Sequence, residues 1–232
     1  MRALPGRSSR SSLVETPASV TRDSVAAEQR RRILRAVAEL VAKRGYDAVK
    51  VDLIVKRARV SFKTFYAHFA GKDECFLAVF DTAAAVAARS MRAAVAEAGD
   101  SWPRQVDAAL RALFSLVTAD PSMARACLVE SLTAGPPLIA RYERALGDFA
   151  ALLEPGRRLS AHEADLPPTL DDTVAGAVSW FLYQRLVVGE IDELRRRRPE
   201  ALEFVLRPYL GEREARAQAR ALAAIGSGDD AA

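Results

Sequence analysis

The segment from Ser61 to Phe69 constrains this chain most, because it reads as one short helix with two incompatible faces. Phe65 and Phe69 lie four residues apart, so they share a face that must be buried. The opposite face carries a mixture of cationic, hydroxyl and aromatic groups that suits phosphates and base edges: Phe62, Lys63 and Tyr66, with Thr64 and His68 near its edge. The pattern predicts a helix with one side in a core and the other on a polyanion.

A second short helix precedes this one, since Val51, Ile54, Val55 and Ala58 follow the i, i+3, i+4, i+7 pattern. The two are separated only by Arg59-Val60, and the Ser61 hydroxyl can cap the second helix. A longer amphipathic helix over residues 30–43, ended by Gly45, supplies the third side of a small core. A helix-turn-helix unit of three helices is therefore expected.

These residues resemble the DNA-binding signature of the tetracycline-repressor (TetR) family, through Ile54, the turn 58–61, residues 64–69 and residues 72–74. Two positions depart from the family pattern, which usually has Gly where this chain has Arg59 and Thr or Ser where it has Lys50. A left-handed Arg59 costs roughly 1–2 kcal/mol, and Lys50 cannot cap a helix as Thr does. The resemblance implies a homodimer, with the last two helices of each subunit forming a four-helix interface, and a small apolar or amphipathic effector in the body.

The charge distribution supports contact with nucleic acid. Residues 1–72 hold 16 Lys and Arg against 6 Asp and Glu, whereas the remainder holds 18 against 24, and all five lysines lie in the first part. A basic segment on an acidic body is typical of a protein that touches a polyanion with one end. We predict these residues as DNA contacts: Lys50, Ser61, Phe62, Lys63, Thr64, Tyr66, His68 and Lys72.

Each of these roles has a structural alternative. Lys63 and Tyr66 could simply form a solvated face, although the helix-turn-helix context favours contact. Phe62 could meet a thymine methyl group. His68 could contact a phosphate or satisfy the helix end, and Lys72 could be a solvated lysine at a helix start.

The chain is predicted to be all-α, with about nine helices, because strand-type alternation of β-branched residues is absent. We expect a disordered basic tail over 1–24, the DNA-binding domain over 25–72, an effector-binding and dimerisation domain over 73–225, and a frayed end over 226–232. The tail could be solvated or could reach DNA. In the body, helices are expected over 72–97, 102–119, 120–135, 136–153, 170–189 and from Pro199 towards Leu222, the last two forming the dimer interface.

Apolar side chains in the body are candidates for an effector pocket, although helical aromatics more often belong to the core. They are Phe114, Met123, Cys127, Phe149 and Trp180. The basic run Arg195–Arg198 is interpreted as a solvated loop rather than a second nucleic-acid site, because Pro199 follows it directly.

No catalytic residue, metal site or cofactor is predicted. The chain has only two histidines and lacks a Gly-rich phosphate loop and a nucleophile elbow. Two cysteines and no apolar run of membrane-spanning length favour a cytoplasmic protein without a membrane partner. The sequence thus predicts a regulator of a palindromic operator, most simply a repressor released by its effector. The alternatives are an activator without an inducer, a DNA-binding module of low sequence specificity and, less simply, a helical enzyme.

Overall fold

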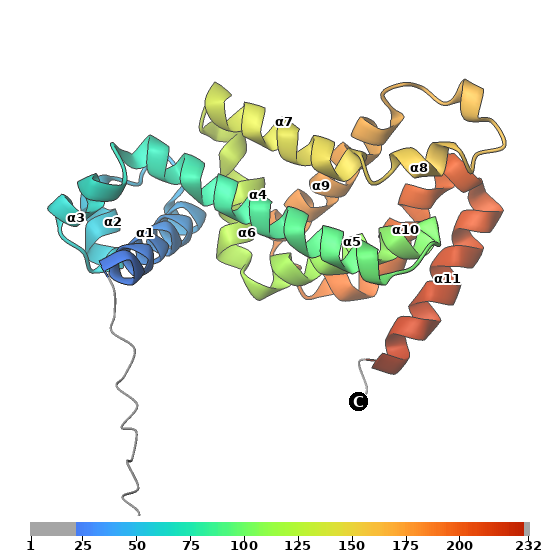
Figure 1. The fold of residues 1–232 in the computed structure, drawn as a ribbon, viewed down its shortest axis with the longest axis horizontal. Coiled ribbons are helices and arrows are strands. Elements are labelled where there is room, and N and C mark those ends of the chain that lie inside the picture. The colour runs from blue at the N-terminus through green and yellow to red at the C-terminus, as the bar shows by residue number, and fades with distance from the viewer. Residues whose placement is uncertain (1–21, 230–232) are drawn as a thin grey trace, which may run out of the picture.

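The computed structural model describes residues 22–229, and the remaining terminal residues, which include most of the expected tails, lie outside the described part. The described residues form α-helices and two short 3₁₀ segments, without strands. In Figure 1 a small unit of α1 to α3 lies at one end, and α4 leads from it into a larger helical body. The helices are α1 (Arg22–Arg44), α2 (Val51–Ala58), α3 (Phe62–His68), α4 (Lys72–Glu97), α5 (Trp102–Ala119), α6 (Pro121–Leu128), α7 (Pro136–Ala150), α8 (Glu154–Arg157), α9 (Leu170–Val188), α10 (Glu193–Leu210) and α11 (Glu212–Asp229).

The first helices enclose a small core that could not form from any one of them alone. Ile33, Val37 and Val41 of α1 are fully buried, and they meet Ile54 of α2 and Phe65 of α3. α1 begins eight residues before the expected start, so residues 22–24 belong to a helix rather than to the tail. Asp23 in its first turn suits the positive end of the helix dipole.

This first core continues into the body, so the expected boundary after residue 72 does not separate two packing units. Phe76 and Val79 of α4 are buried in it, as are Ala126 of α6 and Leu138 of α7. α4 therefore belongs to both parts, with its first turns in the first core and Met91 in the second. Its bounds, Lys72–Glu97, are those predicted from the sequence.

The second core is built from the face-to-face packing of α5, α9 and α10. Leu110, Leu182 and Leu206 are almost fully buried in it. Trp102 and Tyr209 join the end of this core, with ring centroids 5.1 Å apart in an edge-on arrangement. In Figure 1 α11 packs beside α10 at the end of the molecule opposite α1 to α3.

Several boundaries in the body differ from the prediction, which gave about nine helices where the described chain has eleven. α6 ends at Leu128 and gives way to a 3₁₀ segment, Glu130–Thr133, while α7 ends at Ala150. Pro155 and Gly156, expected to stop a helix, lie inside the short α8. The last predicted helix is divided at Gly211, whose φ of 78° separates α10 from α11, and α11 continues to Asp229 through part of the expected frayed end.

The prediction of a solvated loop at Arg195–Arg198 was wrong, because all four arginines lie in α10. Arg198 is largely buried and pairs with Asp107 of α5, which is 3% exposed and also pairs with Arg111 at 3.0 Å. A buried carboxylate needs such partners, since leaving it unpaired in the interior is costly. The basic run is thus partly a structural element of the body.

Among the described residues, no single helix is long and apolar enough to cross a bilayer; only α5 joined to the segment Pro121–Thr133 meets the length and composition test, across a 108° bend.

Candidate nucleic-acid interface and effector cavity

The short helix α3 has the two faces that its sequence predicts. Ser61 precedes the helix in extended conformation, and its Oγ accepts a hydrogen bond from the Thr64 backbone N–H at 3.0 Å. Phe65 and Phe69 are buried, whereas Phe62 and Tyr66 are 51% and 56% exposed. About half of each of these two aromatic side chains is therefore open to solvent on one side of the seven-residue helix.

The turn before α3 depends on a backbone conformation that Arg59 adopts at a cost. Arg59 has φ 53° and ψ 49° and is the only residue other than glycine with positive φ in the described chain. The Arg32 guanidinium of α1 donates to the carbonyl oxygens of Ala58 and Arg59, the second at 2.7 Å. These bonds hold the strained turn, and they leave the Arg59 side chain pointing to solvent.

Four cationic residues around this turn have exposed side chains and no ion pair within the described chain: Lys50, Lys56, Arg59 and Lys63. Lys50 occupies the N-cap position of α2 without a side-chain capping bond, as its chemistry requires. Arg57 differs, because its Nε donates to Glu39 Oε2 at 2.6 Å. These four side chains on α2, the turn and α3 therefore carry positive charge that no carboxylate of the described chain neutralises.

Lys72 and His68 are less available than Lys63. Lys72 Nζ donates to the Tyr46 backbone oxygen at 3.1 Å and lies 4.0 Å from the centre of the Tyr46 ring. The Tyr46 hydroxyl in turn donates to Asp73, and burial, followed by this bond, raises the pKa of Tyr46 above its ordinary value. Lys72 therefore helps to fix the start of α4, and His68 is half-buried beside Phe69.

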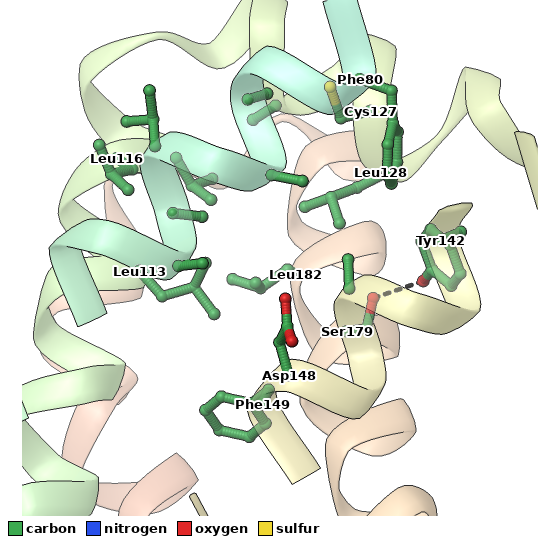
Figure 2. A pocket seen from close by; sticks show the side chains of 18 of the residues that line it. Phe80, Leu113, Leu116, Cys127, Leu128, Tyr142, Asp148, Phe149, Ser179 and Leu182 are labelled. Atoms are coloured by element: carbon green, nitrogen blue, oxygen red, sulfur yellow. Dashed lines mark hydrogen bonds between the residues drawn. The ribbon is translucent and has the colours of Figure 1, made fainter. Parts of the chain in front are cut away.

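A cavity of about 350 Å³ lies inside the body, among α4, α5, α6, α7 and α9. Its walls are mostly apolar, with Phe80 and Met91 of α4, Leu113 and Leu116 of α5, and Leu182 of α9. Figure 2 shows Phe80, Leu113, Leu116 and Leu182 around the cavity. This volume lies at the lower end of the range of small-molecule sites, which are about 300–1,000 Å³. Its lining and size fit a small apolar or amphipathic molecule.

Three of the five residues proposed for an effector pocket line this cavity, namely Met123, Cys127 and Phe149. The other two do not. Phe114 is buried in the second core and stacks on Phe181 at 6.0 Å between ring centroids. Trp180 points outward, is 56% exposed and stacks on Tyr183 at 4.9 Å, because it lies on the opposite face of α9 from Ser179 and Leu182.

The polar groups of the cavity were not singled out from the sequence. The Tyr142 and Ser179 hydroxyls are hydrogen-bonded to each other, and Figure 2 shows them together with the Asp148 carboxylate on the α7 and α9 side of the cavity. Tyr142 and Ser179 are 37 residues apart in the chain, so only the folded structure brings them together. The spacing of Tyr142, Leu146 and Phe149 on one helix face was the available signal for α7.

Helix α6 connects the cavity with the DNA-binding unit. Met123, Cys127 and Leu128 line the cavity, while Ala126 on the same helix is buried against the core of α1 to α3. Arg125 donates through Nε to the Ala42 backbone oxygen in α1 at 3.1 Å and through Nη1 to the Leu186 oxygen in α9 at 3.2 Å. A change in the cavity that moves α6 must therefore disturb the packing of α1.

No group of three or more His, Cys, Asp or Glu side chains that could hold a metal ion is found between residues 22 and 229. The cysteines also lack the features of reactive thiols. Burial raises the pKa values of Cys75 and Cys127 to about 12 each, so both thiols stay protonated near neutral pH.

Comparisons with known proteins agree with this geometry. Residues 33–79 match the family model described as bacterial regulatory proteins, tetR family. The chain is 30% identical over 116 residues to the HTH-type transcriptional activator FasR of Mycolicibacterium smegmatis, a match that covers 50% of this chain and only 52% of that protein. The chain thus spans about half the length of this curated relative.

Solved structures of similar fold extend over more of the chain. The transcriptional regulator FadR from Bacillus subtilis in complex with stearoyl-CoA superposes with a TM-score of 0.67 at 18% identity, covering 76% of this chain and 97% of that one. A gamma-butyrolactone receptor (ArpA-like protein) superposes with a TM-score of 0.63 at 20% identity, covering 86% and 98%. At these identities the likeness concerns the fold alone. Residues 33–79 are thus similar to the helix-turn-helix region of the tetR family of bacterial regulatory proteins, and the described chain has the fold of these two solved structures.

Proposed function

We propose that this protein is a cytoplasmic, dimeric transcriptional regulator that binds a palindromic operator and responds to a small molecule in the body cavity. The observation that carries the proposal is α3, a helix capped by Ser61 that exposes Phe62, Lys63 and Tyr66 beside uncompensated cations. A helix-turn-helix places such a helix in the major groove, where its side chains reach base edges. Two copies would read half-sites about one helical turn apart, or a multiple of that.

Within this proposal the predicted contacts have different roles. Lys63, Tyr66 and Phe62 are proposed to reach the bases, while Ser61, Thr64, His68 and Lys50 would meet the phosphates around them. Lys72 is proposed to act from the start of α4, where its one hydrogen bond to the Tyr46 oxygen leaves two ammonium hydrogens for a phosphate.

The effector is proposed to act through α6, which forms part of the cavity wall and of the contact with α1. A ligand shifts such an equilibrium only by its preference for one of two conformations. Repression relieved by the effector is the simplest reading. Activation is the second candidate, because the similar FasR is named an activator.

The test is a comparison of two variants with a matched control. Lys63→Ala and Tyr66→Ala should each weaken binding to an operator duplex, taken from the DNA upstream of the protein's own reading frame, by about 1–3 kcal/mol. Arg92→Ala, which removes an exposed arginine of α4 without an ion pair, should leave affinity unchanged. Unaltered operator binding in both α3 variants would remove the proposed recognition helix.

Salt dependence and specificity separate the alternatives. Phosphate contacts release counterions, so log affinity should fall with log salt with a slope of about −0.9 for each phosphate neutralised. A regulator should prefer its own operator over random duplex, whereas a module of low specificity should not. A helical enzyme would show turnover and no duplex binding, which would contradict the proposal altogether.

A further inference from the structure

The cavity of the body carries negative but no positive side chains. Its polar lining consists of Thr82, Asp120, Tyr142, Asp148 and Ser179, and no Lys, Arg or His lines it. A ligand with a carboxylate or phosphate head inside the cavity would therefore meet two carboxylates and no cation. Such an arrangement opposes an anionic head group through both repulsion and lost hydration.

The two carboxylates differ in what they already bind. Asp120 caps α6, because its Oδ1 accepts a hydrogen bond from the Met123 backbone N–H at 3.0 Å. This carboxylate therefore already has a structural partner. Asp148 of α7 has neither a hydrogen bond nor an ion pair in the described chain. Arg144 lies one turn earlier on α7 and makes no ion pair with it, while Arg141 is bound to Asp81 at 2.9 Å.

Asp148 marks the place where the cavity meets solvent, since it and Thr82 of α4 are the exposed members of the lining. A molecule that fills the cavity would remove water from this carboxylate. That loss is costly unless the molecule itself supplies a cation or a hydrogen-bond donor. The hydrogen bond between Tyr142 and Ser179 uses only one of their two O–H groups, so a second donor or acceptor is available deeper on the same side (Figure 2).

We propose that the effector cavity selects an amphipathic amine, whose apolar body fills the space between α5 and α9 and whose ammonium group pairs with Asp148. This inference rests on the proposed function only in taking the cavity as the effector site. It also distinguishes this chain from the similar FadR structure, which is described as a complex with stearoyl-CoA.

The experiment measures direct binding of three matched probes to the full-length protein by isothermal titration calorimetry. The probes are decylamine, decanol and decanoate, each below its aggregation concentration. Decylamine should bind with one site per subunit and about two- to fivefold more tightly than decanoate, the upper part of the range expected for one partly exposed charge pair. Decanol should lie between them.

Two variants locate the charge effect. Asp148→Asn keeps the size of the side chain and should remove most of the preference for decylamine over decanoate. Glu143→Gln removes an exposed carboxylate on the same helix that does not line the cavity, and it should preserve the preference. This control separates pairing at Asp148 from the general attraction of a cation to the acidic body.

Three results would overturn the inference: decanoate binding as tightly as decylamine, a preference that survives Asp148→Asn, or no binding of any probe. Operator binding by the same preparation is measured in parallel. Operator binding without a preference for the amine would contradict the amine-selective cavity but not the proposed regulator. A preference for the amine without operator binding would contradict the proposed regulator but not the amine-selective cavity.

Discussion

At the scale of single residues, Gly156 is the position where the absence of a side chain matters most. A Cβ built there would lie 2.3 Å from Cζ2 of Trp102, which is buried and donates through Nε1 to the Leu152 oxygen at 3.1 Å. Gly156→Ala should therefore lower the free energy of unfolding by about 1–3 kcal/mol, as overpacking does. Thermal unfolding by circular dichroism checks this.

Gly147 of α7 is the matched control, because a Cβ there meets no atom within 4 Å. Gly147→Ala should raise the free energy of unfolding by about 0.5–1 kcal/mol, because alanine loses less backbone entropy than glycine when it enters a helix. Equal effects of the two substitutions would show that the Trp102 contact is not what requires glycine at 156.

The two thiols make a prediction about pH. Burial raises the pKa values of Cys75 and Cys127 to about 12, above the ordinary value of 9.0, so the folded state disfavours the thiolates. The resulting stability is complete below about pH 9 and is lost as the pH rises towards about 12. The urea concentration at the midpoint of unfolding should therefore decrease as the pH is raised from 8 to 10.5. The decrease should be smaller in Cys127→Ala.

At the scale of elements, Arg125 is the side chain that ties α6 to both parts of the molecule. Its two acceptors, the oxygens of Ala42 and Leu186, lie in the last turns of α1 and α9, where helix carbonyls lack internal partners and the dipole is negative. Arg125→Met keeps the apolar stem but should lower the free energy of unfolding by about 1.5–3 kcal/mol through the lost charged hydrogen bonds.

The same variant should weaken the response of operator binding to the effector, since α6 would be less firmly held against α1. Arg104→Met, an exposed arginine of α5 without an ion pair, is the control for removing a charge. Chemical denaturation and operator titrations with and without effector measure both effects. Wild-type stability and response in Arg125→Met would mean that α6 is positioned by apolar packing alone.

The elements that could be predicted from the sequence are those fixed by local signals. Gly45 and Gly189 end their helices with positive φ, Ser61 caps α3, and the bounds of α4 follow from periodicity. The failures come from contacts between distant residues. Arg198 pairs with Asp107, 91 residues earlier, and the basic run is helical through Pro199, which was expected to follow a loop.

The two candidate sites also differ in whether they depend on local signals or on contacts between distant residues. The exposed face of α3 could be predicted because it lies within one helix, whereas the cavity required five helices to come together. Periodicity alone could not tell Phe114 and Trp180, which do not line it, from Met123, Cys127 and Phe149, which do.

At the scale of the whole molecule, α9 and α10 expose more large apolar side chains than a monomer needs. Trp180 and Val187 lie on one stripe of α9, with Val188 beside them at 59% exposure, and Phe204 of α10 is 52% exposed. Exposed apolar side chains of this kind are typical of subunit interfaces, and a twofold contact would bury the same side chains on both subunits. We therefore expect the proposed dimer to form through α9 and α10.

Phe204→Glu and Trp180→Glu should each convert the protein to a monomer without unfolding it, because both side chains are exposed and a charge there would be buried only in the dimer. Sedimentation velocity and far-UV circular dichroism test this pair of expectations. Leu159→Glu is the control, since Leu159 is 53% exposed but lies in the connection between α8 and α9, away from these side chains.

Operator affinity should fall about tenfold or more in the monomeric variants, because the second recognition helix would no longer be held near its half-site. Dimers that persist in both variants would place the interface elsewhere. An operator affinity unchanged in the monomeric variants would mean that a single DNA-binding unit is enough for operator binding.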